Sequence, residues 1–348
     1  MGIYWIVFLL TLLGVDISNN KNRYTGYYYF LLLFLIAICA LRNVSVGTDT
    51  PMYTETMTAV VYNNKIHLDE LYYYGQGRDP FFWLIYGTVY MLSGSILVMY
   101  LFHGIVHWTL CGLTIKKNTS FVFLALAVMI AFRFSDFYLN AMRQGISVAL
   151  ILFSYTYIKK RELKYFLCAM AMAVLFHKSS LLFLPMYWLF DISFEKLSKK
   201  KIALFLLFAI AFSSLLYKYV LIHLFQDEYI IYLNVQKSHG ILYFLLYLVS
   251  FVLCVRNADL KDKETQFLTI VCMIAVILQA ATFSNPIFSR ISAIYSIYFT
   301  LLIPRVTGNV CRRQKSYAPQ YFVVMMLFLL YVVGGPAPGV VPYKFFWE

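Results

Sequence analysis

Three arginines stand at the edges of long apolar segments, where they could hold an anion at a membrane surface. Arg42 follows one such segment, and Arg143 and Arg290 each begin another. A guanidinium group is costly beside hydrocarbon, is permanently charged, and offers a rigid fork that fits phosphate oxygens. The residue types therefore predict binding of a phosphate or diphosphate at the headgroup level of a bilayer.

Acid–base chemistry could come from Asp49, Asp79 or His177. Each follows or precedes an apolar segment, and a carboxylate or imidazole can remove a proton from a hydroxyl group. We prefer Asp49 narrowly, because it shares a polar loop with Arg42. The structural alternatives stay open: an Asp before Thr50-Pro51 or Pro80 can begin a helix, and His177 can belong to a polar turn.

Three further residues, Tyr53, Gln144 and Lys178, lie within the same polar stretches and are second-rank candidates for substrate contact. Arg143 is expected in the first turn of a helix, where the positive end of the helix dipole disfavours a cation. Either a phosphate or a nearby carboxylate such as Asp136 would compensate for that placement.

The elements that carry these residues are predicted to be membrane helices. Of 348 residues, 61% are hydrophobic and 13% are charged, against roughly 25% charged in soluble domains. We expect an all-α polytopic membrane protein with one domain, 1–348, and an outer-face loop at about 42–80. About twelve crossings are expected, at residues 3–15, 27–41, 96–115, 120–133, 142–158, 165–176, 180–190, 202–219, 240–256, 266–283, 290–303 and 320–334. The segments at 81–92, 165–176 and 180–190 are shorter than the roughly 20 residues of a full span, and we expect re-entrant or tilted pieces among them.

The distribution of basic residues predicts the orientation of these segments in the membrane. Basic clusters at 116–117, 159–164, 196–201, 256–263 and 305–315 are assigned to the cytoplasm by the positive-inside rule. With 81–92 as a half-membrane or interfacial piece, this puts the N-terminus and the three arginines outside, whereas a full span at 81–92 inverts the N-terminal part of this topology. The net charge of +13 is then mainly a topology signal. Nucleic-acid binding is not expected, since the basic residues form no continuous stripe.

No metal or cofactor is expected. The six cysteines show no CxxC spacing. His103 and His107 share a helix face, but the segment between them lacks the Glu of a metalloprotease helix.

The order of the motifs resembles the EpsG family of polysaccharide polymerases, which is related in role to the Wzy O-antigen polymerases. The matching parts are Arg42 with Gly47-Thr48-Asp49-Thr50 and Tyr53, an acidic residue before Pro80, Met142-Arg143-Gln144-Gly145, Phe176-His177-Lys178-Ser179-Ser180, Arg290 before a tyrosine-rich helix, and the tail Val341-Pro342-Tyr343-Lys344-Phe345-Phe346. One departure is Asp79, where the family pattern leads us to expect Glu.

The resemblance implies a GT-C-like membrane glycosyltransferase of the bacterial inner membrane. Such an enzyme joins undecaprenyl-diphosphate-linked oligosaccharide repeats for O-antigen, capsule or exopolysaccharide at the outer face, in contact with membrane lipid and with a chain-length regulator protein as a possible partner. An O-antigen ligase or a lipid-linked oligosaccharide flippase is the alternative. A ligase would normally show a larger outer loop than those after residue 42 and at 225–240, and a flippase needs polar groups at several depths.

Overall fold

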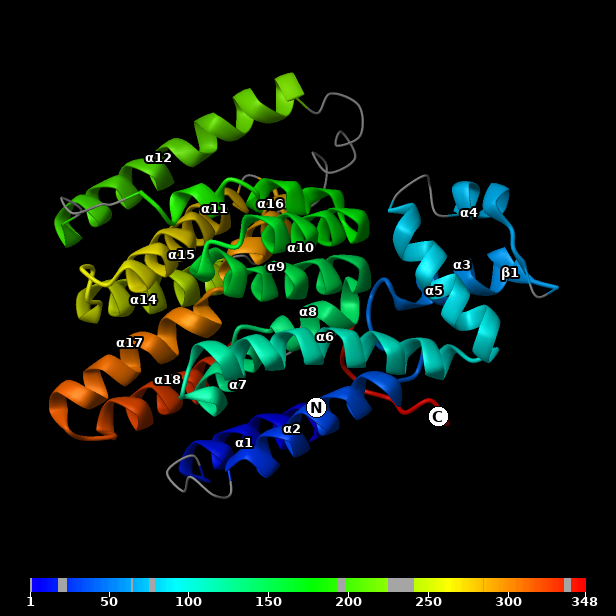
Figure 1. Cartoon of the computed structure of the whole chain (residues 1–348), viewed down its shortest axis with the longest axis horizontal. Helices are drawn as coiled ribbons and strands as arrows, with labels where there is room; N and C mark the ends of the chain where they lie inside the picture. The colour runs from blue at the N-terminus through cyan, green and yellow to red at the C-terminus, as the bar shows by residue number, and fades with distance from the viewer. Residues whose placement is uncertain are drawn as a thin grey trace. The chain divides into compact units, whose positions relative to one another are not determined.

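Helices make up nearly all of the computed structural model, which describes residues 2–17, 24–63, 65–74, 79–192, 198–224, 241–283, 285–334 and 339–348 (Figure 1). The described residues include one strand pair, the short antiparallel hairpin of β1 (Val61–Tyr62) and β2 (Lys65–Ile66). The chain divides into two compact units. Unit 1 comprises Met1–Leu184 with Val324–Glu348, and unit 2 comprises Pro185–Val323. The expectation of one membrane domain stays a prediction.

Unit 1 is a helical bundle in which the long helix α6 (Ile96–Asn118) packs against α2 (Tyr24–Ala40) and α9 (Met142–Lys160). The remaining helices of this unit are α1 (Gly2–Ile17), α3 (Thr50–Val60), α4 (Leu68–Tyr74), α5 (Pro80–Ser93), α7 (Val122–Ala131), α8 (Phe134–Asn140), α10 (Leu163–Phe176) and the 3-10 helix η1 (Lys178–Phe183).

Arg42 and the lysines of α6 lie at opposite ends of unit 1. Helices α2 and α6 are antiparallel, because Tyr28 Oη donates to Gly112 O near one end while Cys39 Sγ donates to Tyr100 O near the other. Lys116 and Lys117 close α6 at the first of these ends. Arg42 follows α2 at the opposite end, so the arginine and the lysines are separated by the length of the bundle.

The polar loop expected at about 42–80 contains elements that hydropathy alone did not show. Helix α3 begins at Thr50 with Pro51 in its first turn, and the β1–β2 hairpin and α4 follow it before α5 begins at Pro80. Helix α3 packs against α4 and α5. These elements lie beside one another in Figure 1 and bring residues from both ends of the polar stretch to the start of α5.

Two segments expected as single helices are broken, and a third ends in a bend. The segment at 120–133 continues as α7 and α8, which meet at 57°, because Arg133 takes a left-handed conformation with φ of 62°. The segment at 180–190 divides at Pro185 into η1 and α11 (Met186–Leu189). The segment at 290–303 divides into α16 (Ile287–Ser296) and α17 (Phe299–Gln314), which meet at 42°.

Unit 2 contains α11, α12 (Lys199–Leu224), α14 (Ile241–Asn257), α15 (Lys263–Ala281), α16, α17 and the first part of α18 (Ala318–Gly334). Asp262 caps α15, with its side chain accepting from Thr265 N at 3.1 Å. Arg305 of α17 donates to the same carboxylate at 2.8 Å and to Glu264 Oε2 at 2.8 Å, which ties α17 to the start of α15. The loop at 225–240 lies outside the described residues.

Two helices within the described ranges are long and apolar enough to cross a membrane, α6 and α15. Four crossings of this kind result if each bent pair, α7 with α8 and α16 with α17, counts as one span. Six shorter apolar helices of 10–17 residues accompany them, in α1, α2, α5, α10, α14 and α18.

Candidate functional site

A carboxylate, a guanidinium and an imidazole from three distant motifs meet at one end of unit 1. Asp79 Oδ2 accepts from Arg143 Nη1 at 3.1 Å and lies 3.1 Å from His177 Nδ1. The Asp79 side chain is 5% exposed, that of Arg143 16% and that of His177 23%. The carboxylate is thus buried beneath two partners that are both partly exposed. We call Asp79, Arg143 and His177 the Asp–Arg–His cluster.

The local fold directs Asp79 into this cluster. Asp79 holds the N-cap position of α5, yet its side chain makes no capping hydrogen bond, and its backbone is left-handed with φ of 48° and ψ of 55°. Pro80 supplies the first residue of the helix, where its missing N–H has no intrahelical partner in any case. The carboxylate is therefore left for Arg143 and His177. Arg78, the neighbouring arginine of this motif, lies outside the described residues.

The unfavourable position of the Arg143 cation in the first turn of α9 is offset by a carboxylate partner and by two neighbouring aromatic rings. Its carboxylate partner is Asp79, whereas Asp136 lies 3.7 Å from Arg133 Nη1. The guanidinium carbon also lies 5.8 Å from the ring centroids of both Tyr53 and Trp83, within the range of cation–π attraction. Tyr53 is 2% exposed, so this candidate for substrate contact packs against Arg143 from the buried side.

The geometry sets the tautomer of His177. An ionised carboxylate can only accept hydrogen bonds, so His177 Nδ1 donates to Asp79. In the neutral ring Nε2 is then the unprotonated nitrogen, which is available to accept a proton. His177 ends α10 in an extended conformation, with φ of −161°.

Arg42 is buried at the same end of the bundle, with 1% exposure. Its Nη1 donates to Leu139 O at 2.8 Å, and its guanidinium carbon lies 4.4 Å from the ring centroid of Tyr100. Its Nε and Nη2 have no hydrogen-bond partner, and it forms no ion pair within the described ranges. A buried cation with two unpartnered donors is energetically costly and calls for a specific explanation, such as a bound water, an anion or a catalytic role.

The C-terminal tail encloses the backbone of Arg42. Phe346 N donates to Leu41 O at 2.9 Å and Asn43 N donates to Lys344 O at 2.9 Å, so that Arg42 faces Phe345 in an antiparallel bridge. In Figure 1 the C-terminus accordingly lies near the end of α2. The tail thus fixes the residue from which the buried guanidinium extends.

The loop after Arg42 is fastened to the break between α8 and α9. Thr50 Oγ1 donates to Val46 O at 2.9 Å and lies 3.2 Å from Leu139 O, the oxygen that Arg42 also contacts. Thr48 N donates to Asn140 Oδ1 at 2.8 Å. Gly47 takes φ of 110°, which favours glycine, and a Cβ there would lie 2.6 Å from Leu139 O. The Gly-Thr-Asp-Thr stretch therefore holds the loop after Arg42 against the end of α8.

The other candidates fall in different environments. Asp49 is half-buried and accepts from Thr48 Oγ1 at 3.3 Å, and it occupies the N-cap position of α3 without a capping hydrogen bond from its side chain. Gln144 is 2% exposed in the first turn of α9. Lys178 is exposed at the start of η1. Arg290 is exposed in the first turn of α16, in unit 2. The roles expected for all of these residues stay predictions.

Sequence reasoning missed Trp83, Tyr100 and the buried Arg133. Trp83 lies four residues after Asp79, a spacing that puts both on one face of a helix, and this signal was available. Arg133 Nη2 donates to Tyr331 O at 2.8 Å, and its guanidinium carbon lies 4.0 Å from the Tyr331 ring centroid. No sequence pattern links these two residues, which stand 198 positions apart.

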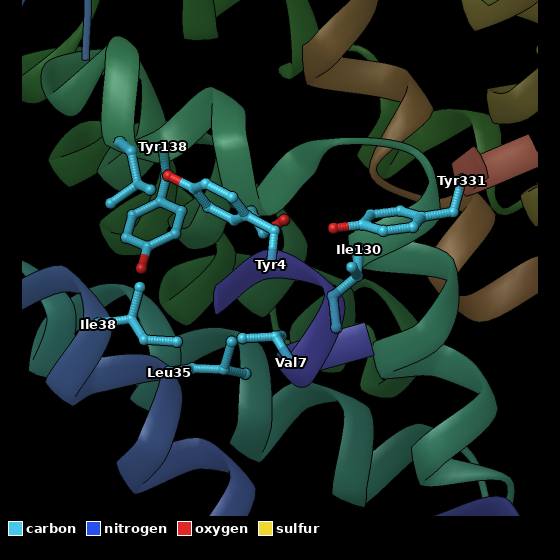
Figure 2. Close-up of a pocket in the computed structure, with 9 residues that line it drawn as sticks. Tyr4, Val7, Leu35, Ile38, Ile130, Tyr138 and Tyr331 are labelled. Atoms are coloured by element: carbon cyan, nitrogen blue, oxygen red, sulfur yellow. The ribbon is translucent and has the colours of Figure 1, made fainter. Parts of the chain in front are cut away.

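Unit 1 also contains a small cavity (Figure 2). It is lined by Tyr4, Val7, Leu35, Ile38, Ile130, Ser135, Tyr138, Leu139 and Tyr331. The lining is mostly apolar. Tyr4, which points into it in Figure 2, donates from Oη to Val340 O at 2.7 Å and so connects α1 with the tail. We therefore assign this cavity to the packing of unit 1.

A helical bundle with apolar helices of membrane-spanning character and a polar cluster at one end defines a polytopic membrane protein. The model of the EpsG family matches residues 3–345, nearly the whole chain. The chain belongs to this family of membrane proteins, which is linked to exopolysaccharide biosynthesis. Searches of curated proteins and of solved structures gave no significant match.

Proposed function

We propose that the protein is a polysaccharide polymerase that transfers a growing glycan from undecaprenyl diphosphate to a second lipid-linked repeat unit. In this proposal the short apolar helices also lie in the bilayer, giving about twelve crossings of the bacterial inner membrane. The Asp–Arg–His cluster then faces the periplasm or the cell exterior. The observation that carries the proposal is the Asp79 carboxylate held 3.1 Å from both Arg143 and His177.

The acid–base part of the reaction is assigned to His177. The acceptor hydroxyl oxygen forms a bond to the anomeric carbon of the donor sugar, and the bond from that carbon to the diphosphate oxygen breaks. The bonding electron pair leaves with undecaprenyl diphosphate, and the hydroxyl proton passes to His177 Nε2. Asp79 holds the ring in the required tautomer and stabilises the imidazolium that forms, as a carboxylate does beside a catalytic histidine elsewhere.

Charge on the departing diphosphate requires cations that are already in place. Arg143 is positioned by Asp79 and by its aromatic neighbours, and Arg42 has two donors without partners. Preorganised cations stabilise developing charge without reorganising during the reaction. We assign diphosphate binding to Arg42 and Arg143. The proposed site is built from unit 1 alone, and Arg290 remains a predicted further contact.

The glycan made by a deletion strain separates this function from its rivals. Loss of a polymerase leaves single repeats on the lipid anchor or its acceptor, whereas loss of a flippase or a ligase leaves no surface glycan. We expect the deletion to yield single repeats and the wild-type gene to restore a ladder of chain lengths. An Arg143→Ala gene should supply protein of similar abundance but no long chains. Absence of all surface glycan from the deletion strain would reject the proposal.

A further inference from the structure

Two buried histidines of α6 hold the helices that carry the Asp–Arg–His cluster. His103 Nε2 lies 3.2 Å from Tyr138 O, and because a carbonyl can only accept, Nε2 donates. His103 Nδ1 is then the unprotonated nitrogen, and it accepts from Tyr86 Oη at 2.6 Å. His103 thus connects α6 with both α5 and α8.

His107, one turn further along α6, uses the other ring nitrogen. Its Nδ1 donates to Gly145 O at 3.2 Å, and its ring stacks on Tyr138 with centroids 4.3 Å apart. His107 is 3% exposed and His103 is fully buried. Polar side chains at such depth in a membrane bundle are costly and need a specific task.

The carbonyls that these histidines contact flank Arg143. Tyr138 O belongs to the last turn of α8, where carbonyls lack intrahelical partners, and Gly145 O lies two residues beyond Arg143 in α9. Ala141, at the break between the two helices, has φ of −105° and ψ of 70°, outside the helical region. The imidazoles therefore form hydrogen bonds on both sides of the irregular connection between α8 and α9. We call this connection, residues 138–145, the joint.

The same contacts reach the helix of Asp79. Tyr86 lies seven residues after Asp79 in α5, two turns along the same face. Trp108 Nε1 donates to Tyr138 Oη at 2.8 Å, and a Cβ at Gly145 would lie 2.9 Å from Tyr138 Cβ. The joint is thus closely packed as well as hydrogen-bonded, and α6 is the element common to α5, α8 and α9.

We propose that His103 and His107 are positioning residues that set the distance between Arg143 and Asp79 through the hydrogen bonds of their ring nitrogens. Neither ring touches the substrate in this account. The inference rests on the proposed function for its kinetic consequence, whereas its structural consequence for the joint at 138–145 can be measured without it.

The test uses amide replacements that copy one ring nitrogen each. The Asn amide nitrogen stands where His Nδ1 stands, and the Gln amide nitrogen where His Nε2 stands. His107→Asn should therefore preserve the bond to Gly145 O and His107→Gln should lose it. At position 103 the preference reverses, because Nε2 is the donor to Tyr138 O: His103→Gln should be the better replacement and His103→Asn the worse.

Two readouts apply to the full-length protein in nanodiscs. Hydrogen exchange of the backbone at 138–146 should rise for the two poor replacements alone. Turnover of a defined lipid-linked repeat should fall by about tenfold or more for the same two, with KM within about twofold, because a small displacement of a catalytic group is costly. Thr114→Val, which removes a buried hydrogen bond within α6 from Thr114 Oγ1 to Leu110 O, is the matched control and should change neither.

Each outcome has one meaning. The opposite Asn and Gln preferences at the two positions would support the proposal. Equal effects of both amides at each position, or failure of all four variants to fold, would assign the imidazoles to packing and overturn it. If the wild-type protein makes no polymer while the exchange pattern is as expected, the proposed function fails and the positioning of the joint stands.

Discussion

Arg143 and Asp79 form a partly buried ion pair, with Nη1 and Oδ2 3.1 Å apart, although 64 residues separate them. The pair joins the start of α9 to the start of α5, and His177 at the end of α10 completes it. A cation in the first turn of a helix is unfavourable on its own, so the carboxylate is a condition for placing Arg143 there.

Replacing Asp79 by Asn should reduce turnover by about a hundredfold or more, because the amide no longer stabilises a protonated His177. The measurement is polymer formation per unit time by the purified variant. Asp191→Asn is the control, since Asp191 forms an exposed pair with Lys263 at 3.5 Å in unit 2. That variant should retain wild-type turnover. Comparable losses in both variants would remove the special role of Asp79.

Arg42→Met should abolish polymer formation while changing the free energy of unfolding by less than about 1 kcal/mol. Two of its donors have no partner, and the one hydrogen bond of its side chain within the described residues is that to Leu139 O at 2.8 Å. Arg133→Met should instead destabilise the protein by about 3 kcal/mol, since it leaves the buried Asp136 without the cation beside it. Denaturant titration in detergent measures the free energy of unfolding of each variant, and the two values are compared. A large destabilisation by Arg42→Met would indicate that Arg42 serves only to hold the structure.

Deleting residues 341–348 should expose the backbone around Arg42. The deletion removes the hydrogen bonds that the tail forms with Leu41 and Asn43. Maleimide labelling of an Asn43→Cys variant should become faster when the tail is absent, and polymer formation should fall. Unchanged labelling would show that the tail does not cover this site in the membrane.

Acid should weaken the start of α15 through Asp262. Burial opposes ionisation of this carboxyl, but hydrogen bonds from Thr265 and Arg305 outweigh that effect and lower its pKa below the ordinary value of 3.8. Because the folded-state pKa is the lower one, the stabilisation is present above pH 3.8 and is lost as the pH falls through the folded-state pKa.

Thermal unfolding of wild type and Asp262→Asn between pH 6 and pH 3 measures this contribution, because these pH values bracket the ordinary pKa of a carboxyl group. The wild-type advantage should shrink toward the acid end. The Asn side chain can still cap α15, which makes this a comparison of charge. An advantage that is constant across the range would contradict the lowered pKa.

The helices were predictable from the sequence largely because apolar runs report burial in lipid or protein. The breaks were not. Arg133, at the left-handed turn, donates to Tyr331 O near the other end of the chain, and no local pattern encodes that contact. Helix α3 was considered only as the alternative in which Asp49 begins a helix, and α4 was missed. Both are short and lie in a polar stretch, so hydropathy carries little information about them.

The sequence predicted which residues belong to the candidate site better than it predicted which of them form ion pairs with one another. Asp79, Arg143 and His177 were all named from residue type and position, but the sequence offered Asp136 as the nearer partner for Arg143. Tertiary packing decides between the two carboxylates. The burial of Arg42 could not be inferred either, because the tail that covers it lies about three hundred residues away, between 339 and 348.

The most direct test of the central claim uses purified protein in proteoliposomes with one defined undecaprenyl-diphosphate-linked repeat unit. Polymer length and released undecaprenyl diphosphate are measured together for wild type, His177→Gln and Arg143→Ala. The account predicts that wild type releases one carrier for each linkage formed and that both variants release almost none. Glycan chains formed by either variant at the wild-type rate, or carrier left unreleased as wild type consumes the repeat, would contradict it.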